Sequence, residues 1–72
     1  MTVELVDKDG VLFSGKAEKI VVPGVLGSMG ILNNHTPLFS PLKSGKIKID
    51  DKIFDVQEGF VNVSDNYVII LA

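Results

Sequence analysis

Hydrophobic and polar residues alternate along most of this chain. The alternation is strict in Lys46–Asp50 and again in Val61–Ser64. A period of two residues is typical of β-strands, because successive side chains of a strand point to opposite faces of its sheet. Valine and isoleucine, which favour strands, are frequent, and seven glycines and three prolines interrupt the chain too often for a long helix. The pattern therefore predicts an all-β protein.

Turn residues divide this pattern into nine short strands. Glycine, asparagine and aspartate gather between the alternating runs, as in Asp7–Gly10 and Ser64–Asn66, where they permit tight turns. The predicted strands cover residues 2–7, 11–14, 17–22, 29–32, 36–42, 46–50, 53–57, 60–64 and 67–71. Strands so closely spaced are typical of antiparallel hairpins that pack as a two-sheet β-sandwich or a flattened barrel. No linker or repeat is visible, so residues 1–72 are predicted to form a single domain.

Composition narrows the classes of function. The 72 residues carry a formal net charge of −2 and contain no cysteine, which excludes a disulfide framework and a thiolate metal site. All the positive side chains are lysines, and this balance disfavours nucleic acid as a partner, because arginine and a basic surface are the usual requirements. No apolar run approaches the roughly 20 residues of a membrane-spanning helix, and no signal peptide is visible. Direct membrane insertion is therefore not expected.

A catalytic or metal-binding site is not predicted. His35 is the only histidine, and it lies in a loop-like segment with no serine and aspartate partners in a recognisable motif. The nine acidic residues are spread over turns and polar strand faces, and nothing marks a pair that shares a cleft. We expect no catalytic residue, no metal and no cofactor.

The segment Pro23–Leu32 is the most informative part of the sequence. Its glycines have the spacing G-x-x-G-x-x-G, but no helical pattern follows, so a dinucleotide-binding turn is not predicted, and a phosphate-binding loop would need Gly-Lys-Ser or Gly-Lys-Thr. The segment carries four apolar side chains that cannot all face one small core, namely Val25, Leu26, Met29 and Ile31. The segment therefore predicts a sharply turned loop that presents apolar side chains for docking.

Several ordered motifs together resemble the epsilon subunit of F-type ATP synthase. They are Leu12-Phe13-Ser14-Gly15, Pro23-Gly24-x-x-Gly27-x-x-Gly30-Ile31-Leu32, His35-Thr36-Pro37-Leu38, Leu42-Lys43-x-Gly45-x-Ile47 and Gly59-Phe60-Val61-x-Val63. The resemblance implies an N-terminal β-sandwich that is followed in the family by a helical hairpin. This chain resembles the sandwich alone and ends where the hairpin would begin, either as a natural short form or as a truncation. The inhibitory functions of the helical arm are not expected of it.

The resemblance also implies partners and positions. In this family the sandwich links the gamma subunit to the ring of c subunits, as a non-catalytic rotor component of a proton-translocating synthase. By position, Ser28 and Met29 are expected to face the c-ring, and His35 and Ser40 to face gamma. The implied location is peripheral, on the cytoplasmic side of the bacterial inner membrane or the equivalent side of an energy-transducing organelle membrane.

This sequence departs from the family's pattern at three places. Ser28 occupies a position that is often acidic in relatives. Asn33-Asn34 replaces a usual Pro-Gly, although asparagine tolerates the left-handed backbone of such a turn. Glu58 replaces the first glycine of a usual pair.

A second class of function stays open from the residues alone, namely a free-standing β-barrel that serves as a carrier or binds nucleic acid. A carrier needs a lysine at a hairpin tip, and none lies beside Met29. A nucleic-acid barrel needs exposed aromatic residues and basic charge.

Overall fold

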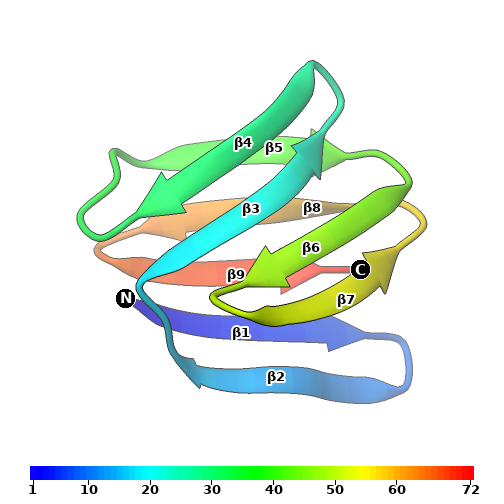
Figure 1. The fold of residues 1–72 in the computed structure, drawn as a ribbon, viewed down its shortest axis with the longest axis horizontal. Coiled ribbons are helices and arrows are strands. Elements are labelled where there is room, and N and C mark those ends of the chain that lie inside the picture. Colours follow the sequence, from blue (N-terminus) through cyan, green and yellow to red (C-terminus); the bar gives the residue numbers. More distant parts are fainter.

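The chain folds into nine β-strands and contains no helix, as shown by a computed structural model that describes residues 1–72 (Figure 1). The strands are β1 (Thr2–Asp7), β2 (Gly10–Lys16), β3 (Lys19–Gly24), β4 (Gly27–Leu32), β5 (Leu38–Leu42), β6 (Gly45–Ile49), β7 (Lys52–Val56), β8 (Gly59–Ser64) and β9 (Tyr67–Leu71). All nine predicted strands are confirmed, with bounds shifted by two residues or fewer.

The strands form one continuous sheet that curls into two layers. Hydrogen-bonded neighbours follow the order β2-β1-β9-β8-β5-β3-β6-β7, and β4 pairs with β3. A single register pair, Gly24 with Leu42, joins β3 to β5. At this join the sheet turns over, so that β3, β4, β6 and β7 lie across the layer made by β5, β8, β9, β1 and β2 (Figure 1). The predicted sandwich or flattened barrel is confirmed.

One strand pair departs from the antiparallel expectation. β1 runs parallel to β9, with Val3 opposite Val68 and Leu5 opposite Ile70, whereas every other pair is antiparallel. Neighbouring strands joined by a tight turn must run in opposite directions, but β1 and β9 lie at opposite ends of the chain. No turn links them, so their relative direction is set by the packing of the layer.

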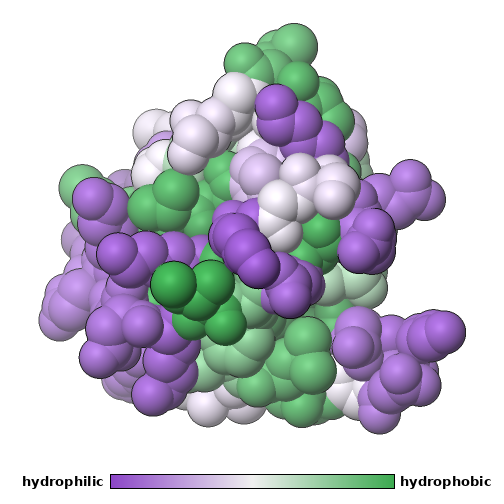
Figure 2. All heavy atoms as spheres, turned by 45° about the vertical axis from the view of Figure 1, so that its right-hand side comes forward, coloured by the Kyte–Doolittle hydropathy of each residue, from purple (hydrophilic) through white to green (hydrophobic).

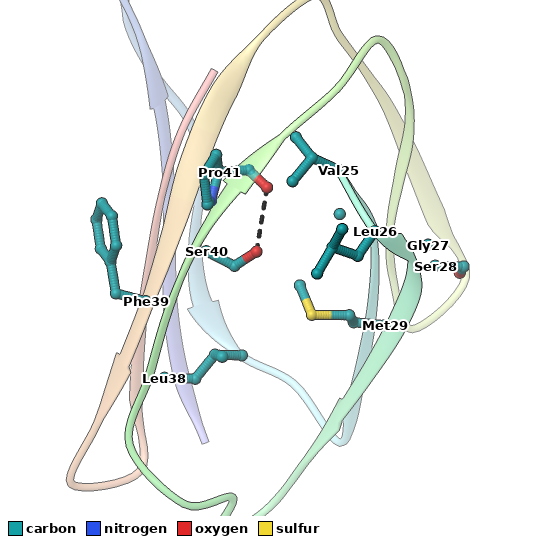
Figure 3. Close-up of a pocket in the computed structure, with 10 residues that line it drawn as sticks. Val25, Leu26, Gly27, Ser28, Met29, Leu38, Phe39, Ser40 and Pro41 are labelled. Atoms are coloured by element: carbon teal, nitrogen blue, oxygen red, sulfur yellow. Dashed lines mark hydrogen bonds between the residues drawn. The ribbon is translucent and has the colours of Figure 1, made fainter.

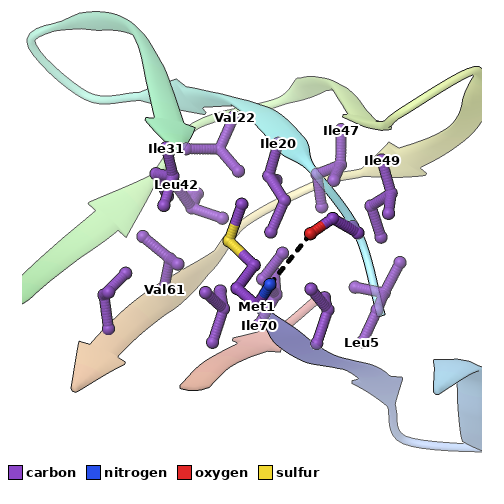
Figure 4. Close-up of a cluster of buried hydrophobic side chains, with 14 of the residues drawn as sticks. Met1, Leu5, Ile20, Val22, Ile31, Leu42, Ile47, Ile49, Val61 and Ile70 are labelled. Atoms are coloured by element: carbon purple, nitrogen blue, oxygen red, sulfur yellow. Dashed lines mark hydrogen bonds between the residues drawn. The ribbon is translucent and has the colours of Figure 1, made fainter. Parts of the chain in front are cut away.

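Small aliphatic side chains fill the space between the layers. Fifteen hydrophobic residues form one buried cluster, and no polar or charged residue is buried with them (Figure 4). Full burial of such a side chain contributes about 1.5 to 3 kcal/mol. Met1 belongs to this cluster, and its amino group donates a hydrogen bond of 3.0 Å to the carbonyl oxygen of Ala17. The first residue is thus part of the core and ties β1 to the connection between β2 and β3.

The open side of the sandwich is closed by aromatic side chains. β2 and β7 are the two free ends of the strand order. Phe13 of β2 and Phe54 of β7 meet edge to face, with ring centroids 6.2 Å apart. Such a contact is worth about 0.5 to 1.5 kcal/mol beyond the burial of the rings.

Asparagine and aspartate side chains stabilise the turns by accepting hydrogen bonds from the backbone of neighbouring segments. Asn34 has the left-handed backbone that asparagine tolerates, with a φ of 61°, and its N–H donates to the side-chain oxygen of Asn66 at 2.9 Å. Asp50 is also left-handed, with a φ of 52°, and its carboxylate accepts hydrogen bonds of 3.0 Å from the N–H groups of Glu18 and Lys19. These bonds connect the β4–β5 loop to the β8–β9 turn, and the β6–β7 turn to the β2–β3 connection.

The glycine that follows Glu58 stands at a close approach of two strands. A Cβ atom on Gly59 would lie 1.8 Å from the carbonyl oxygen of Leu71, so no larger residue fits there without moving the backbone. The side chain of Glu58 is exposed. Its replacement of a glycine therefore leaves the close approach intact, because Gly59 provides it.

Candidate docking surfaces

The most exposed apolar residues of the predicted loop lie at the tip of the β3–β4 hairpin. Leu26 is fully exposed there, and Val25 beside it is exposed as well. Figure 2 shows hydrophobic side chains at the top of the molecule, where this tip projects. The turn needs its glycines, because Gly27 has a φ of 140° and a Cβ on Gly24 would lie 2.8 Å from the carbonyl oxygen of Gly27.

A groove of about 420 Å³ lies between this hairpin and β5. Leu26 and Met29 line it from the hairpin, and Leu38 and Ser40 line it from β5 (Figure 3). Two backbone hydrogen bonds that are not part of the strand pairing join its two walls. The N–H of Val25 donates to the carbonyl oxygen of Pro41 at 3.3 Å. The N–H of Lys43 donates to the carbonyl oxygen of Pro23 at 2.9 Å. The groove is therefore a fixed feature of the fold and mainly apolar.

The structure divides the apolar residues of the loop, as the sequence predicted. Ile31 is completely buried in the core, and Met29 is half-buried and packs against the core. The end of the Met29 side chain lies only 3.0 Å from the position that a Cβ on Gly24 would take. Ser28 is exposed at the start of β4. Of the two residues expected to face the c-ring, Ser28 is thus open to a partner, whereas Met29 mainly supports the hairpin.

The two residues expected to face gamma lie in different surroundings. Ser40 lines the groove with Met29, and its hydroxyl donates to the carbonyl oxygen of Pro41 at 3.1 Å. His35 is half-buried in the β4–β5 loop outside the groove, and its Nδ1 lies 2.8 Å from the carbonyl oxygen of Thr36. The structure therefore brings Ser40 together with Ser28 and Met29 and leaves His35 apart from them.

Sequence reasoning missed a second apolar surface, on the outer face of the layer that contains β5. One register row crosses five strands and carries only apolar side chains on this face, which we call the outer apolar row: Pro41 opposite Phe60, Phe60 opposite Leu71, Leu71 opposite Val6, and Val6 opposite Val11. Each strand contributes one residue at most, so no local stretch reveals the row. A signal exists in hindsight, since Phe60-Val61 and Ile70-Leu71 are apolar pairs that break the alternation at this level.

Polar groups occupy the remaining surface without forming a chemical site. Lys46 and Asp55 form an ion pair across β6 and β7. Tyr67 donates a hydrogen bond from its hydroxyl to Glu4, and this bond raises the pKa of the Tyr67 phenol. A second hollow, of about 330 Å³, lies at the opposite end of the molecule between the β1–β2 turn and the end of β7. No group of three histidine, aspartate or glutamate side chains is placed to hold a metal ion.

No helix of this structure is long and apolar enough to cross a membrane. The fold and the two exposed apolar surfaces define a small β-sandwich whose candidate sites are docking surfaces. The matching family model is that of the ATP synthase delta/epsilon chain β-sandwich domain, and the match covers residues 1–72. The chain therefore belongs to this family.

Curated relatives support the same assignment. The chain is 39% identical over 72 residues to the ATP synthase epsilon chain of Caulobacter vibrioides, and the match covers 94% of this chain and 84% of that one. It is 40% identical over 77 residues to the epsilon chain of Brevibacillus brevis, and the match covers all of this chain and 58% of the relative. Against the epsilon chain of Dichelobacter nodosus the covered share of the relative is 52%. The chain thus spans little more than half the length of several relatives.

Solved structures confirm the fold. A chain in the mitochondrial ATP synthase central stalk/c-ring structure of Tetrahymena thermophila superposes with a TM-score of 0.85 at 21% identity, and covers 99% of this chain and 61% of that one. A chain in the Euglena gracilis mitochondrial ATP synthase structure, which contains OSCP, F1 and the c-ring, gives a TM-score of 0.87 at 22% identity, with 97% and 48% covered. At such identities the likeness concerns the fold.

Proposed function

We propose that the chain is a non-catalytic central-stalk subunit of a proton-translocating F-type ATP synthase, which links the gamma subunit to the c-ring. Family membership supports this proposal, and so does the presence of similarly folded chains in central-stalk and c-ring assemblies. The observation that carries it is the hairpin tip, where Leu26 is fully exposed on a tight glycine turn. An apolar side chain held out in this way gains free energy only when a partner covers it, by about 1.5 to 3 kcal/mol for leucine.

In the proposed role the domain transmits torque by contact and transfers no proton. This requires a body that does not shear between its two attachment points. The sandwich provides 42 backbone hydrogen bonds, of which 36 lie within its strands, and a core of interlocked valine and isoleucine side chains. Because close-packed interiors are nearly incompressible, a load applied at the hairpin tip is passed to the rest of the domain.

Two contacts are proposed, one with the c-ring and one with gamma. Ser28 faces the c-ring. Leu26 is proposed as a further ring-facing residue, because its side chain is fully exposed at the same hairpin tip. Met29 belongs to the same contact mainly by fixing the hairpin. His35 and Ser40 are proposed to face gamma. Ser28 carries no charge, so the ring contact is proposed to depend on apolar burial and hydrogen bonding rather than on an ion pair.

We assign neither inhibition of hydrolysis nor ATP binding to residues 1–72, because these functions belong to the helical part of the family and this sequence contains no helix. The proposed location is peripheral, on the cytoplasmic side of a bacterial inner membrane or the equivalent side of an organelle membrane. The β3–β4 hairpin tip presents Val25 and Leu26 and no lysine, so it does not offer the attachment site that the carrier alternative needs.

The proposal is tested by reconstitution. The purified chain is mixed with the gamma subunit of the same synthase and run on gel filtration with light scattering, and the gamma–chain complex is then captured on purified c-ring. We expect a 1:1 complex with gamma and retention on the ring. Leu26→Glu should reduce retention on the ring and leave the complex with gamma unchanged. Failure of the unaltered chain to bind gamma would refute the proposed function.

A further inference from the structure

The groove beside the β3–β4 hairpin holds the more accessible of the chain's two sulfur atoms. The sequence contains no cysteine, so its two methionines carry all of the sulfur. Met29 is half-buried and lines the groove, and its side chain projects into the space between the hairpin and β5 (Figure 3). Met1 is only 8% exposed, and its sulfur lies among buried aliphatic side chains (Figure 4). An oxidant that diffuses into the groove therefore reaches the sulfur of Met29 first.

The packing of Met29 depends on an apolar side chain. Its Cε and Cγ atoms lie 3.0 and 3.5 Å from the position that a Cβ on Gly24 would take, so the side chain lies directly against the backbone of β3. No charged side chain lines the groove, and its only side-chain hydrogen-bond donors are the hydroxyls of Ser28 and Ser40. The Ser40 hydroxyl already donates to the carbonyl oxygen of Pro41 at 3.1 Å. A polar oxygen added to the sulfur therefore finds water more readily than a protein partner.

We propose that Met29 is an oxidation site of this chain, and that its sulfoxide weakens the contact of the hairpin with the c-ring. The second part rests on the proposed function. The oxidant is a peroxide. A lone pair of the sulfur attacks one peroxide oxygen, and the O–O bond breaks as the S–O bond forms. The proton of the transferred oxygen passes to the departing hydroxide, which leaves as water. The sulfur is thereby oxidised by two electrons and the peroxide is reduced by two.

Oxidation acts on the hairpin because it changes the surroundings that this side chain prefers. A sulfoxide is polar, and burial of its oxygen without a hydrogen bond is unfavourable. The side chain therefore turns toward the water in the groove and leaves the backbone of Gly24. Of the two backbone bonds that join the groove walls, the one at the tip, from Val25 to Pro41, is long at 3.3 Å and a weak restraint by itself. Leu26 and Ser28 are then presented to the ring less rigidly.

The test follows the two methionines separately. The purified chain is treated with hydrogen peroxide, and the gain of one oxygen at Met1 and at Met29 is measured over time by mass spectrometry of proteolytic peptides. The thermal midpoint is measured by circular dichroism. The treated chain is then mixed with untreated gamma, and capture of the complex on untreated c-ring is measured. Met29→Leu is the matched variant, because leucine has a similar volume and cannot form a sulfoxide. Each variant is compared with its own untreated sample.

We expect Met29 to be oxidised at least about tenfold faster than Met1, since sulfoxide formation follows exposure. Peroxide should lower the thermal midpoint and weaken capture on the ring by at least about fivefold, and methionine sulfoxide reductase with a thiol reductant should restore both. Treated Met29→Leu should match its untreated sample.

Three results would overturn the inference: equal oxidation rates at the two methionines, an oxidised Met29 with midpoint and capture unchanged, or equal losses in Met29→Leu, which would assign the effect to another residue. If the untreated chain does not bind gamma or the ring, the proposed function fails. The oxidation rates and the thermal midpoints then still decide whether Met29 is the oxidation site.

Discussion

Replacement of Gly59 by alanine is expected to destabilise the domain strongly, although it adds one methyl group. The new Cβ would lie 1.8 Å from the carbonyl oxygen and 2.9 Å from the carbonyl carbon of Leu71, and 3.1 Å from the Cα of Ala72. All three atoms belong to the backbone, so no side-chain rotation relieves the clash, and β9 must move away from β8. Overpacking of a fixed site costs about 1 to 3 kcal/mol, and we expect about 3 kcal/mol here.

This loss is large for so small a domain. A stability of roughly 0.05 to 0.15 kcal/mol per residue gives about 4 to 11 kcal/mol in total. A destabilisation of about 3 kcal/mol lowers the thermal midpoint by roughly 12 to 24 °C, at about 4 to 8 °C for each kcal/mol. The assay is urea and thermal unfolding followed by circular dichroism.

The matched control is Gly30→Ala. Gly30 also lies within a strand, its φ is not positive, and a Cβ there meets nothing within 4 Å. Alanine should be neutral or stabilise by up to about 1 kcal/mol, because it lowers the entropy of the unfolded chain. If Gly59→Ala and Gly30→Ala unfold within about 0.5 kcal/mol of each other, the geometric argument is refuted.

Three further outcomes are expected. Met29→Glu should lower the free energy of unfolding in urea by about 2 to 3 kcal/mol, because it places a carboxylate against the core. Leu26→Glu should leave the urea midpoint unchanged, because Leu26 is fully exposed. A larger loss for Leu26→Glu than for Met29→Glu would contradict the packing described for the hairpin. Asn66→Ala should cost about 1 to 2 kcal/mol, since it removes a hydrogen-bond acceptor and strains a backbone with a φ of 59°, and Asn66→Gly should recover the part due to strain. Tyr67 is the only tyrosine, so ultraviolet titration should give a pKa above its ordinary value of 10.0 that falls toward that value in Glu4→Gln. Only the neutral phenol donates this hydrogen bond, so the bond stabilises the fold below pH 10 and the stabilisation is lost as the pH rises through the raised pKa. A Tyr67 pKa that is the same in Glu4→Gln would count against the bond.

The local features of this fold could be predicted because they are encoded locally. The alternation in Lys46–Asp50 and Val61–Ser64 has the period of a strand, and the strands formed there. The turn at Asn33-Asn34 could be predicted from the tolerance of asparagine for a left-handed backbone, and Asn34 has the expected φ.

Features that depend on pairing distant strands could not be predicted in the same way. Nothing near Thr2–Asp7 indicates a parallel neighbour from the other end of the chain. The outer apolar row takes one residue from each of five strands, so it exists only after the register is set. For the same reason the sequence placed Ser40 and Met29 on different surfaces, whereas the turn of the sheet between β3 and β5 brings them into one groove.

The edge-to-face contact of Phe13 and Phe54 has a mechanical consequence. On the side where β5 meets β3, covalent chain and hydrogen bonds run from one layer to the other, but no backbone hydrogen bond joins β2 to β7. Two short covalent connections also lead from these edge strands to the other layer, β2 to β3 through residues 17–18 and β7 to β8 through residues 57–58. A force that separates β2 from β7 is therefore resisted along their length by the contact of the two rings, and at the strand ends by these short connections.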